Sequence, residues 1–420
     1  MLRQPRGLRF VPPVAALLVA LFLAGCPGRL RPAGTPVTVF VSGPLSLEDI
    51  AYHGALVEGR RTSGACVWLV GGDALADRRA AYLTRGAAQV RLVEAAGADA
   101  VVLGPEWLEF GTGRLAELVG ESRFQFLGAN IVDSTGAELG HPFYVRQVNG
   151  AALGLTAVWA DSADPRLDLP GVGLVAPRFA AGKVLPLLRR RAEVVGIAVR
   201  PAGPLPDGDA DFAVGAEEAN RPSVAVPARP GELARLEMTI DGGRIAGFRA
   251  TAPVPVDARP GVELRAVLDS VVAAVETLAG RPVTTAQLAI PAATLTNALV
   301  AGSVGKGVDG FLHDRPLFRD SLGPGPVTVG RVIDLLEEPG RAALVTLTGR
   351  EVQSLLKQEP VQAGWRKGVT MVRMPLNKEY RLLATRGFLA RHPEAAAGGA
   401  EPDSLALWER AVEVLGRAGQ

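Results

Sequence analysis

Residues 97–111 read GADAVVLGPEWLEFG, and this stretch decides the fold that the sequence predicts. Its apolar first half, 99–103, is typical of a buried strand, and the glycines and charges that follow are typical of a loop. In α/β proteins, the loop after the carboxyl end of a strand usually carries the functional side chains. This loop offers the carboxylates Glu106 and Glu109 and the indole of Trp107, and it contains no histidine. We therefore take it as a candidate site loop.

The segments on either side of this stretch alternate between strand and helix patterns. Apolar runs rich in β-formers predict strands at 36–43, 65–73 and 124–132, and helical spacing predicts a helix over 76–96. Further strand patterns follow at 193–200 and 209–215, and the DGG turn within 234–252 predicts a β-hairpin. This alternation predicts an α/β fold with helices on both faces of a sheet.

The length of 420 residues exceeds what one compact core accommodates, so we expect two domains. The proline-bearing stretch PVPVDARPG at 253–261 marks the boundary between them, and a helical pattern follows at 262–279. We expect the following parts along the chain: a signal peptide (1–25), a tether (26–35), a first domain (36–252), a linker with a bridging helix (253–280), a second domain (281–392) and a C-terminal tail (393–420).

The N-terminus has the pattern of a targeting segment. A basic start with Arg3, Arg6 and Arg9 precedes an apolar run that ends in LAGC at 23–26. This ending resembles the bacterial lipobox, and the resemblance implies cleavage before Cys26 and lipidation of its thiol. We therefore expect a membrane anchor at Cys26 that holds the protein at the periplasmic side of the cell envelope. The residue after the cysteine is a proline and not the aspartate associated with inner-membrane retention, which favours the outer membrane.

The charge, aromatic content and cysteine count of the chain indicate which partners and disulfides to expect. The net charge is +2 and aromatic residues make up 5%, so we expect no nucleic acid partner. The chain has two cysteines, and if Cys26 carries lipid, Cys66 has no partner for a disulfide within the chain. Cys66 lies in an apolar strand pattern and is expected to be a buried core residue.

Four segments, together with the site-loop stretch, carry a family resemblance. VWLVGGDAL (67–75), GADAVVLGPEWLEFG and FQFLGANIVDSTG (124–136) resemble strand-and-loop motifs of the 5′-nucleotidase family of metallophosphoesterases. The stretches 323–356 and 375–390 resemble segments of the C-terminal domain of that family. The resemblance implies an α/β fold, a four-layer metallophosphoesterase sandwich, followed by a smaller α/β C-terminal domain that resembles the family's nucleotide-binding domain. It covers roughly residues 36–392.

The resemblance also implies a set of metal ligands, because the family hydrolyses phosphate esters with two divalent metals. Asp73 keeps the position of the aspartate that bridges the metals. Pro105 and Glu106 stand where the family has asparagine and histidine, and Arg200 and Glu218 stand at later ligand positions. The Asp-x-His motif after the first strand is missing as well. The four histidines of the chain have no metal-binding spacing, and we expect them on the surface or in loops.

Three interpretations of the remnant site Asp73, Glu106, Arg200 and Glu218 stay open. Arg200 can replace the metal charge within a salt-bridge network. Alternatively, the three carboxylates can hold one hard divalent cation. In the third interpretation the charged side chains face solvent at loop tips. We expect no cofactor, and at most one divalent cation.

The sequence thus favours a lipid-anchored, catalytically inactive 5′-nucleotidase-like protein. It would act as a binding or scaffolding component of the cell envelope, with an envelope protein as a candidate partner. The alternative is a divergent metal-dependent phosphoester hydrolase that acts on nucleotides in the periplasm. The family's Gly-Gly-Asp-Gly turn is missing after Phe388, which argues against nucleotide binding and leaves a changed small-molecule ligand open.

Overall fold

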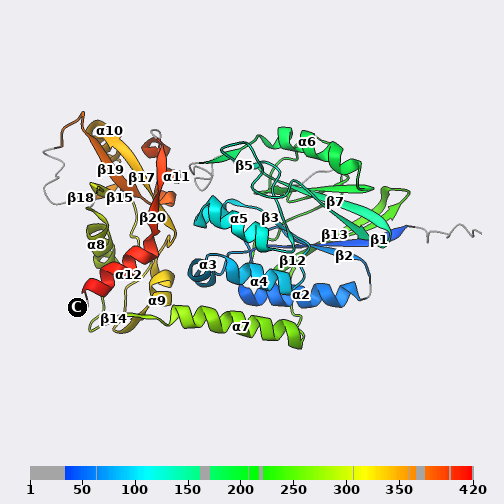
Figure 1. Ribbon diagram of the computed structural model, residues 1–420, viewed down its shortest axis with the longest axis horizontal. Helices are drawn as coiled ribbons and strands as arrows, with labels where there is room; N and C mark the ends of the chain where they lie inside the picture. The colour runs from blue at the N-terminus through cyan, green and yellow to red at the C-terminus, as the bar shows by residue number, and fades with distance from the viewer. Residues whose placement is uncertain are drawn as a thin grey trace, which may run out of the picture.

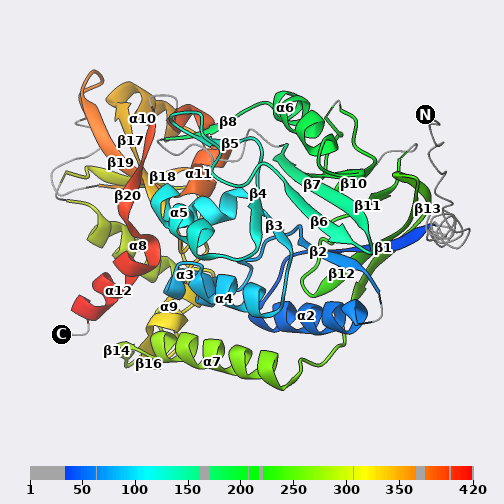
Figure 2. The same ribbon diagram turned by 45° about the vertical axis from the view of Figure 1, so that its right-hand side comes forward.

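The computed structural model describes residues 34–62, 64–160, 171–206, 208–216, 221–305, 307–358, 360–365, 374–396 and 399–418. The predicted signal peptide, Cys26 and most of the tether lie outside the described residues, and so does Glu218. Among the described residues, no helix combines the length and the apolarity that a membrane crossing needs. The chain folds into two parts that lie side by side, and α7 runs along one edge of both (Figures 1 and 2).

Two sheets form the centre of the first part. The first sheet has the strand order β13-β12-β1-β2-β3-β4, and its strands β1 to β4 are parallel. The second sheet has the order β11-β10-β9-β7-β6, with β6 antiparallel to β7. The strands of the first sheet are β13 (Arg244–Pro255), β12 (Glu232–Asp241), β1 (Thr35–Ser42), β2 (Cys66–Val70), β3 (Ala100–Val102) and β4 (Gln125–Leu127). Those of the second are β11 (Ser223–Val224), β10 (Phe212–Val214), β9 (Val194–Arg200), β7 (Ala151–Trp159) and β6 (Tyr144–Val148).

Helices cover both outer faces of this pair of sheets. The first sheet is covered by α2 (Leu47–Arg61), α3 (Arg78–Thr84), α4 (Ala87–Ala95), α5 (Thr112–Glu121) and α7 (Val262–Ala279), and the second by α6 (Pro177–Arg189). A short β5 (Ile131–Asp133) pairs with β8 (Val172–Leu174) beside them. The predicted four-layer α/β sandwich is confirmed.

Strand β2 shows why the sequence folds into four layers. All five of its residues, CVWLV, are buried, as a strand covered on both faces requires. Because side chains alternate along a strand, Trp68 and Val70 pack in the core beneath the helices, whereas Val67 and Leu69 pack in the core between the two sheets. Cys66 is 4% exposed, which confirms the predicted buried thiol.

The second part is a smaller α/β domain around a five-stranded sheet of order β18-β15-β19-β17-β20. Its strands are β18 (Gln362–Trp365), β15 (Gly310–His313), β19 (Glu379–Ala384), β17 (Arg341–Thr348) and β20 (Ala400–Ala406), and β14 (Pro282–Ala286) pairs separately with β16 (Gly325–Thr328). Its helices are α8 (Ala292–Ser303), α9 (Val329–Leu335), α10 (Gly349–Leu355), α11 (Arg386–Arg391), the 3₁₀ helix η3 (Pro393–Ala396) and α12 (Leu407–Ala418).

The segment expected as a tail is built into this second domain. Strand β20 pairs antiparallel with β17, and α12 buries Leu407, Ala411 and Leu415 at a spacing of four residues. The small residues at 393–400 conceal this element in the sequence, so the structure replaces the tail with an edge strand and a packed helix.

Helix α7 connects the two domains and has the bounds that its sequence pattern predicts. It packs against α2, α3 and α4 of the first domain and against α9 of the second.

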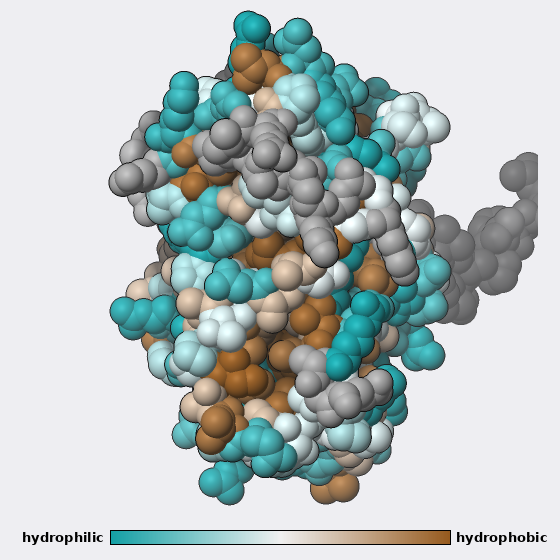
Figure 3. Space-filling model, turned by 90° about the vertical axis from the view of Figure 1, so that its left-hand side faces the viewer, coloured by the Kyte–Doolittle hydropathy of each residue, from teal (hydrophilic) through white to brown (hydrophobic). Residues whose placement is uncertain are grey.

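Apolar surface gathers on the face of the second domain that is turned away from the first (Figure 3). Helix α8, AATLTNALVAGS, lies on this side and contains no charged residue. This apolar face lies opposite the surface where the two domains meet (Figures 1 and 3).

Candidate functional site

The candidate site lies where the two domains meet, at the carboxyl ends of β2, β3 and β9. The predicted site loop folds as the 3₁₀ helix η1 (Pro105–Phe110), which follows β3 directly. Gly104 lets this helix start close to its neighbours, because a Cβ at Gly104 would lie 2.3 Å from Glu106 Oε2 and 2.7 Å from Arg200 Nη1. A larger residue at this point would displace the ends of both side chains.

Arg200 and Glu106 form a buried ion pair. Arg200 Nη1 donates to Glu106 Oε1 over 2.7 Å and to the carbonyl oxygen of Gly72 over 3.1 Å. The two side chains are 15% and 6% exposed, and the guanidinium lies 5.4 Å from the centre of the Trp159 ring. This is the contact that the salt-bridge interpretation predicts. Arg200 therefore ties together the ends of β2 and β9 and the helix η1.

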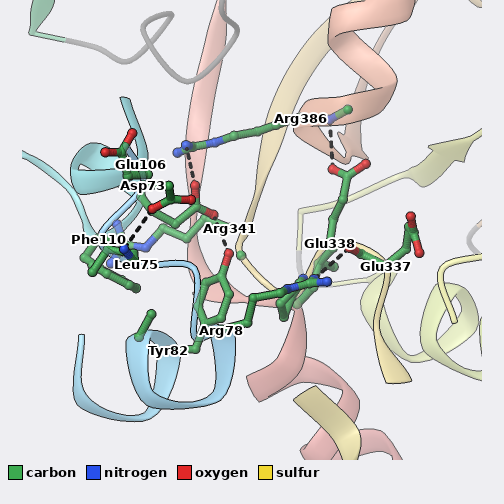
Figure 4. A pocket seen from close by; sticks show the side chains of 16 residues that line it. Asp73, Leu75, Arg78, Tyr82, Glu106, Phe110, Glu337, Glu338, Arg341 and Arg386 are labelled. Atoms are coloured by element: carbon green, nitrogen blue, oxygen red, sulfur yellow. Dashed lines mark hydrogen bonds and ion pairs between the residues drawn. The ribbon is translucent and has the colours of Figure 1, made fainter. Parts of the chain in front are cut away.

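Asp73 reaches the same edge from the end of β2. Its Oδ1 accepts a hydrogen bond from the backbone N–H of Leu75 over 2.8 Å, and the side chain is half-buried. The structure therefore brings Asp73, Glu106 and Arg200 together, as Figure 4 shows for the two carboxylates. Glu218, the fourth predicted residue, lies outside the described residues.

The donors in this part of the chain do not fit a two-metal centre. No group of three or more His, Cys, Asp and Glu among the described residues is placed to hold a metal ion. The Glu106 carboxylate already pairs with a guanidinium, whose fixed positive charge would repel a bound cation. Pro105 supplies no side-chain donor at the asparagine position.

The histidines do not contribute ligands either, and two of them are not where we expect them. His53 is 0% exposed and His313 is 8% exposed, so the prediction of surface or loop positions is wrong for both. His53 lies on the buried face of α2 together with Ile50 and Val57, and burial lowers the pKa of its imidazole.

His53 takes part in a closed hydrogen-bond chain at the end of β1. Its Nε2 donates to the carbonyl oxygen of Gly231 over 3.1 Å, which leaves Nδ1 to accept from the Ser42 hydroxyl over 2.7 Å. Trp68 Nε1 donates to the same hydroxyl over 2.7 Å. The resemblance places the Asp-x-His motif at this strand end. The serine–histidine contact is sealed from solvent, so it stabilises the core and offers no nucleophile to a substrate.

A second polar cluster joins the two domains. Glu109 of η1 accepts from Arg386 of α11 over 3.3 Å and from the Tyr82 hydroxyl over 3.3 Å. The Arg386 and Glu109 side chains are 10% and 14% exposed. Gly340 allows this approach, because a Cβ there would come within 1.6 Å of Glu109 Oε1. Burial raises the pKa of the Tyr82 hydroxyl well above its usual value, so the hydroxyl stays protonated and donates.

These contacts border a cavity of about 440 Å³ between the domains (Figure 4). Its volume is in the range of small-molecule sites. The charged and aromatic side chains that line it are Asp73, Arg78, Tyr82, Glu106, Glu109, Phe110, Glu337, Glu338, Arg341 and Arg386. Most of these residues are not predicted from the sequence. The second domain supplies four of them from distant parts of the chain: Glu337, Glu338, Arg341 and Arg386.

Comparison with known proteins supports this description of the fold. No protein-family model matches the sequence, and no significant match was found among curated proteins. Solved structures do match. A Staphylococcus aureus protein assigned as a 5′-nucleotidase, in complex with α-ketoglutarate, superposes with a TM-score of 0.67 at 11% identity and covers 92% of this chain and 97% of its own. A 5′-nucleotidase precursor from Thermus thermophilus gives a TM-score of 0.56 at 15% identity, with 91% and 97% covered.

The chain has the fold of the 5′-nucleotidases. A third structure with this fold is the sulfate thiohydrolase SoxB of Thermus thermophilus in complex with glycerol, with a TM-score of 0.55 at 19% identity over 88% of this chain and 80% of that one. The predicted 5′-nucleotidase-like, two-domain fold is thereby confirmed. At these identities the likeness concerns the fold alone.

Proposed function

We propose that this protein is a non-catalytic, lipid-anchored member of the bacterial cell envelope that uses a 5′-nucleotidase fold to bind a ligand or partner. The observation that carries the proposal is the ion pair of Arg200 with Glu106. It stands at the strand ends where the resemblance places the metal ligands.

The physical reason is the charge that two metals require. Two dications close together need several anionic or imidazole ligands to offset their repulsion. This chain offers Asp73 at that edge, whereas the Glu106 carboxylate is paired with Arg200. A two-metal centre supplies the hydroxide nucleophile and clamps the phosphate oxygens. The residues present do not fit such a centre, so we derive no hydrolytic step from it.

Anchoring belongs to the same proposal. A lipidated Cys26 would hold the mature chain at the periplasmic face of a membrane, with the outer membrane favoured, because multiple acyl chains bind a bilayer stably. In that position the cavity between the domains would be open to periplasmic small molecules or to an envelope protein. The Staphylococcus aureus protein with this fold is in complex with α-ketoglutarate, which supports a small molecule as the ligand.

A divergent phosphoester hydrolase is the second candidate. Asp73 favours it, since this half-buried carboxylate keeps the family position and lines the cavity. The names of the structural neighbours, a 5′-nucleotidase precursor and a thiohydrolase, favour it as well.

Phosphoesterase assays on the purified mature chain separate the two candidates. The chain and its Asp73→Ala variant are assayed against nucleotides and other phosphate esters with Mn²⁺, Zn²⁺, Mg²⁺ or Ca²⁺ added. We expect no turnover above the rate of the variant with any metal. Turnover that Asp73→Ala abolishes would establish the hydrolase instead.

A further inference from the structure

We infer that the cavity between the domains binds a small zwitterion, a molecule with one anionic and one cationic group such as an amino acid or a short peptide. The inference rests on the proposed function, in which this cavity binds and does not hydrolyse. The ligand class follows from the charged side chains in the cavity that form no ion pair among the described residues.

Several of the charges that line the cavity are neutralised within the protein. Glu106 pairs with Arg200 over 2.7 Å, and Glu109 pairs with Arg386 over 3.3 Å. Glu337 pairs with Arg319 over 2.8 Å. These three pairs leave Asp73, Glu338, Arg78 and Arg341 as the lining charges that make no ion-pair contact in the described part of the chain, and Arg391 acts on Glu338 only through its longer-range charge.

The two remaining carboxylates come from opposite walls. Asp73 of the first domain accepts from the backbone N–H of Leu75, and Glu338 of the second domain accepts from the backbone N–H of Gly387 over 2.8 Å. Both side chains are half-buried, and backbone donors orient them without cancelling their charge. Figure 4 shows the two side chains on the two sides of the cavity.

The two remaining guanidinium groups also lie between the domains. Arg78 donates to the carbonyl oxygens of Leu336 and Glu337 over 3.2 and 2.7 Å, and both acceptors are neutral. Arg341 extends from β17 toward the first domain, where its Nη1 lies 3.8 Å from the place of a Cβ on Gly111. Arg341 also lines an adjoining cavity of about 300 Å³, so this residue borders both spaces.

Carboxylates and guanidinium groups that form no ion pair within the described ranges of the chain lie in the same half-buried space. This arrangement favours a ligand that carries both a positive and a negative charge. Interactions between charges strengthen as water is excluded, so a carboxylate near Arg341 and an ammonium near Asp73 or Glu338 would each gain binding energy. A phosphate dianion would leave the carboxylates unmatched and be repelled by them, and a simple cation would leave Arg341 unmatched. The volume of about 440 Å³ is large enough for an amino acid or a dipeptide.

Isothermal titration calorimetry on the full mature chain tests the inference. The probes are the protein amino acids and the dipeptide alanyl-alanine as zwitterions, succinate and adenosine monophosphate as anions, and putrescine as a cation. We expect at least one zwitterion to bind with a dissociation constant at least about tenfold below those of the anions and the cation. The inference is overturned if no zwitterion binds, or if an anion or the cation binds as tightly as the best zwitterion.

Charge-neutral variants locate the binding. Asp73→Asn keeps an oxygen for the Leu75 N–H, and Arg341→Gln keeps a polar side chain of similar reach. Each should weaken the best zwitterion by at least about tenfold. Arg350→Gln, an exposed position on α10 away from the cavity, should leave the affinity unchanged. Unchanged affinity in both cavity variants would contradict the inference. Hydrolysis of adenosine monophosphate would contradict the proposed function separately, whichever probe binds.

Discussion

Arg200 at the end of β9 contacts Glu106 of η1 over 2.7 Å, at the edge of the sandwich where β2 and β3 also end. Both side chains are largely buried, and the same guanidinium nitrogen contacts the carbonyl of Gly72. One cationic side chain therefore links three segments at the edge where the sequence resemblance predicts metal ligands. A fixed organic cation has no open coordination position, so it provides cohesion without activating water.

Removing one partner of this pair should strongly destabilise the first domain. Arg200→Met leaves the Glu106 carboxylate buried beside an apolar side chain, and we expect a loss of about 3–5 kcal/mol in the free energy of unfolding. The double variant Arg200→Met with Glu106→Leu should recover most of this loss. Arg265→Met, which breaks an exposed pair with Asp269, should cost less than about 1 kcal/mol. Urea denaturation followed by tryptophan fluorescence measures all three, and equal losses in the single and double variants would argue against the pairing.

The contact of Glu109 with Arg386 should hold the two domains together. In Arg386→Ala, the Tyr82 hydroxyl is the donor to Glu109 that remains among the described residues, so we expect the domains to separate more often. Small-angle scattering should then show a larger radius of gyration than in the wild type.

Gly340→Ala tests the same contact from the other side. The added methyl group would overlap Glu109 Oε1, so this variant should also open the interface. Gly113→Ala is the matched control, since a Cβ there meets no atom within 4 Å. A radius of gyration that stays at the wild-type value in both Arg386→Ala and Gly340→Ala would show that other contacts fix the domains.

Stability should fall in mild acid because of His53. Burial lowers the pKa of this imidazole in the folded state, so below about pH 6.5 the unfolded chain binds a proton that the folded chain does not. The free energy of unfolding should therefore decrease as the pH drops from about 6.5 toward the folded-state pKa. His313 acts in the same direction, since burial lowers its pKa too.

The His53→Asn variant should show a shallower slope of unfolding free energy against pH below about 6.5. The part of the slope that His313 contributes should remain. Urea midpoints measured at several pH values give this slope. A slope equal to that of the wild type would mean that His53 does not titrate differently in the folded and unfolded states.

Cys26 should determine where the protein is found in a bacterial cell. We expect the wild type in the membrane fraction and the Cys26→Ala variant in the soluble fraction, because the variant lacks the thiol that accepts the lipid. Cys66→Ala is the control, since that thiol is buried in β2 and should not affect fractionation. Membrane association of the Cys26→Ala variant would rule out lipidation as the anchor.

The sequence predicts the first domain well because its strands are buried on both faces. Such strands appear as continuous apolar runs, and β2 with Trp68 is an example. The loop with Glu106 and the strand that ends in Arg200 are predictable for the same reason, since each follows such a run directly.

The contacts between domains are not visible in local patterns. Glu109 and Arg386 are 277 positions apart, and the helical or strand character of each segment says nothing about how the domains pack. The burial of His53 depends on which face of α2 meets the sheet, and β20 is concealed by small residues beside it. These features arise from tertiary packing, which local patterns do not determine.

The most direct test of the central claim is a calorimetric titration of Mn²⁺ into the metal-free wild type and into the Arg200→Met variant. If the guanidinium takes the place of metal charge, the wild type binds no Mn²⁺ at stoichiometric levels. In Arg200→Met, the freed carboxylate of Glu106, together with Asp73, then binds Mn²⁺ more tightly than the wild type does. Stoichiometric Mn²⁺ binding by the wild type, weakened by Asp73→Ala, would contradict the account and restore a metal centre to this fold.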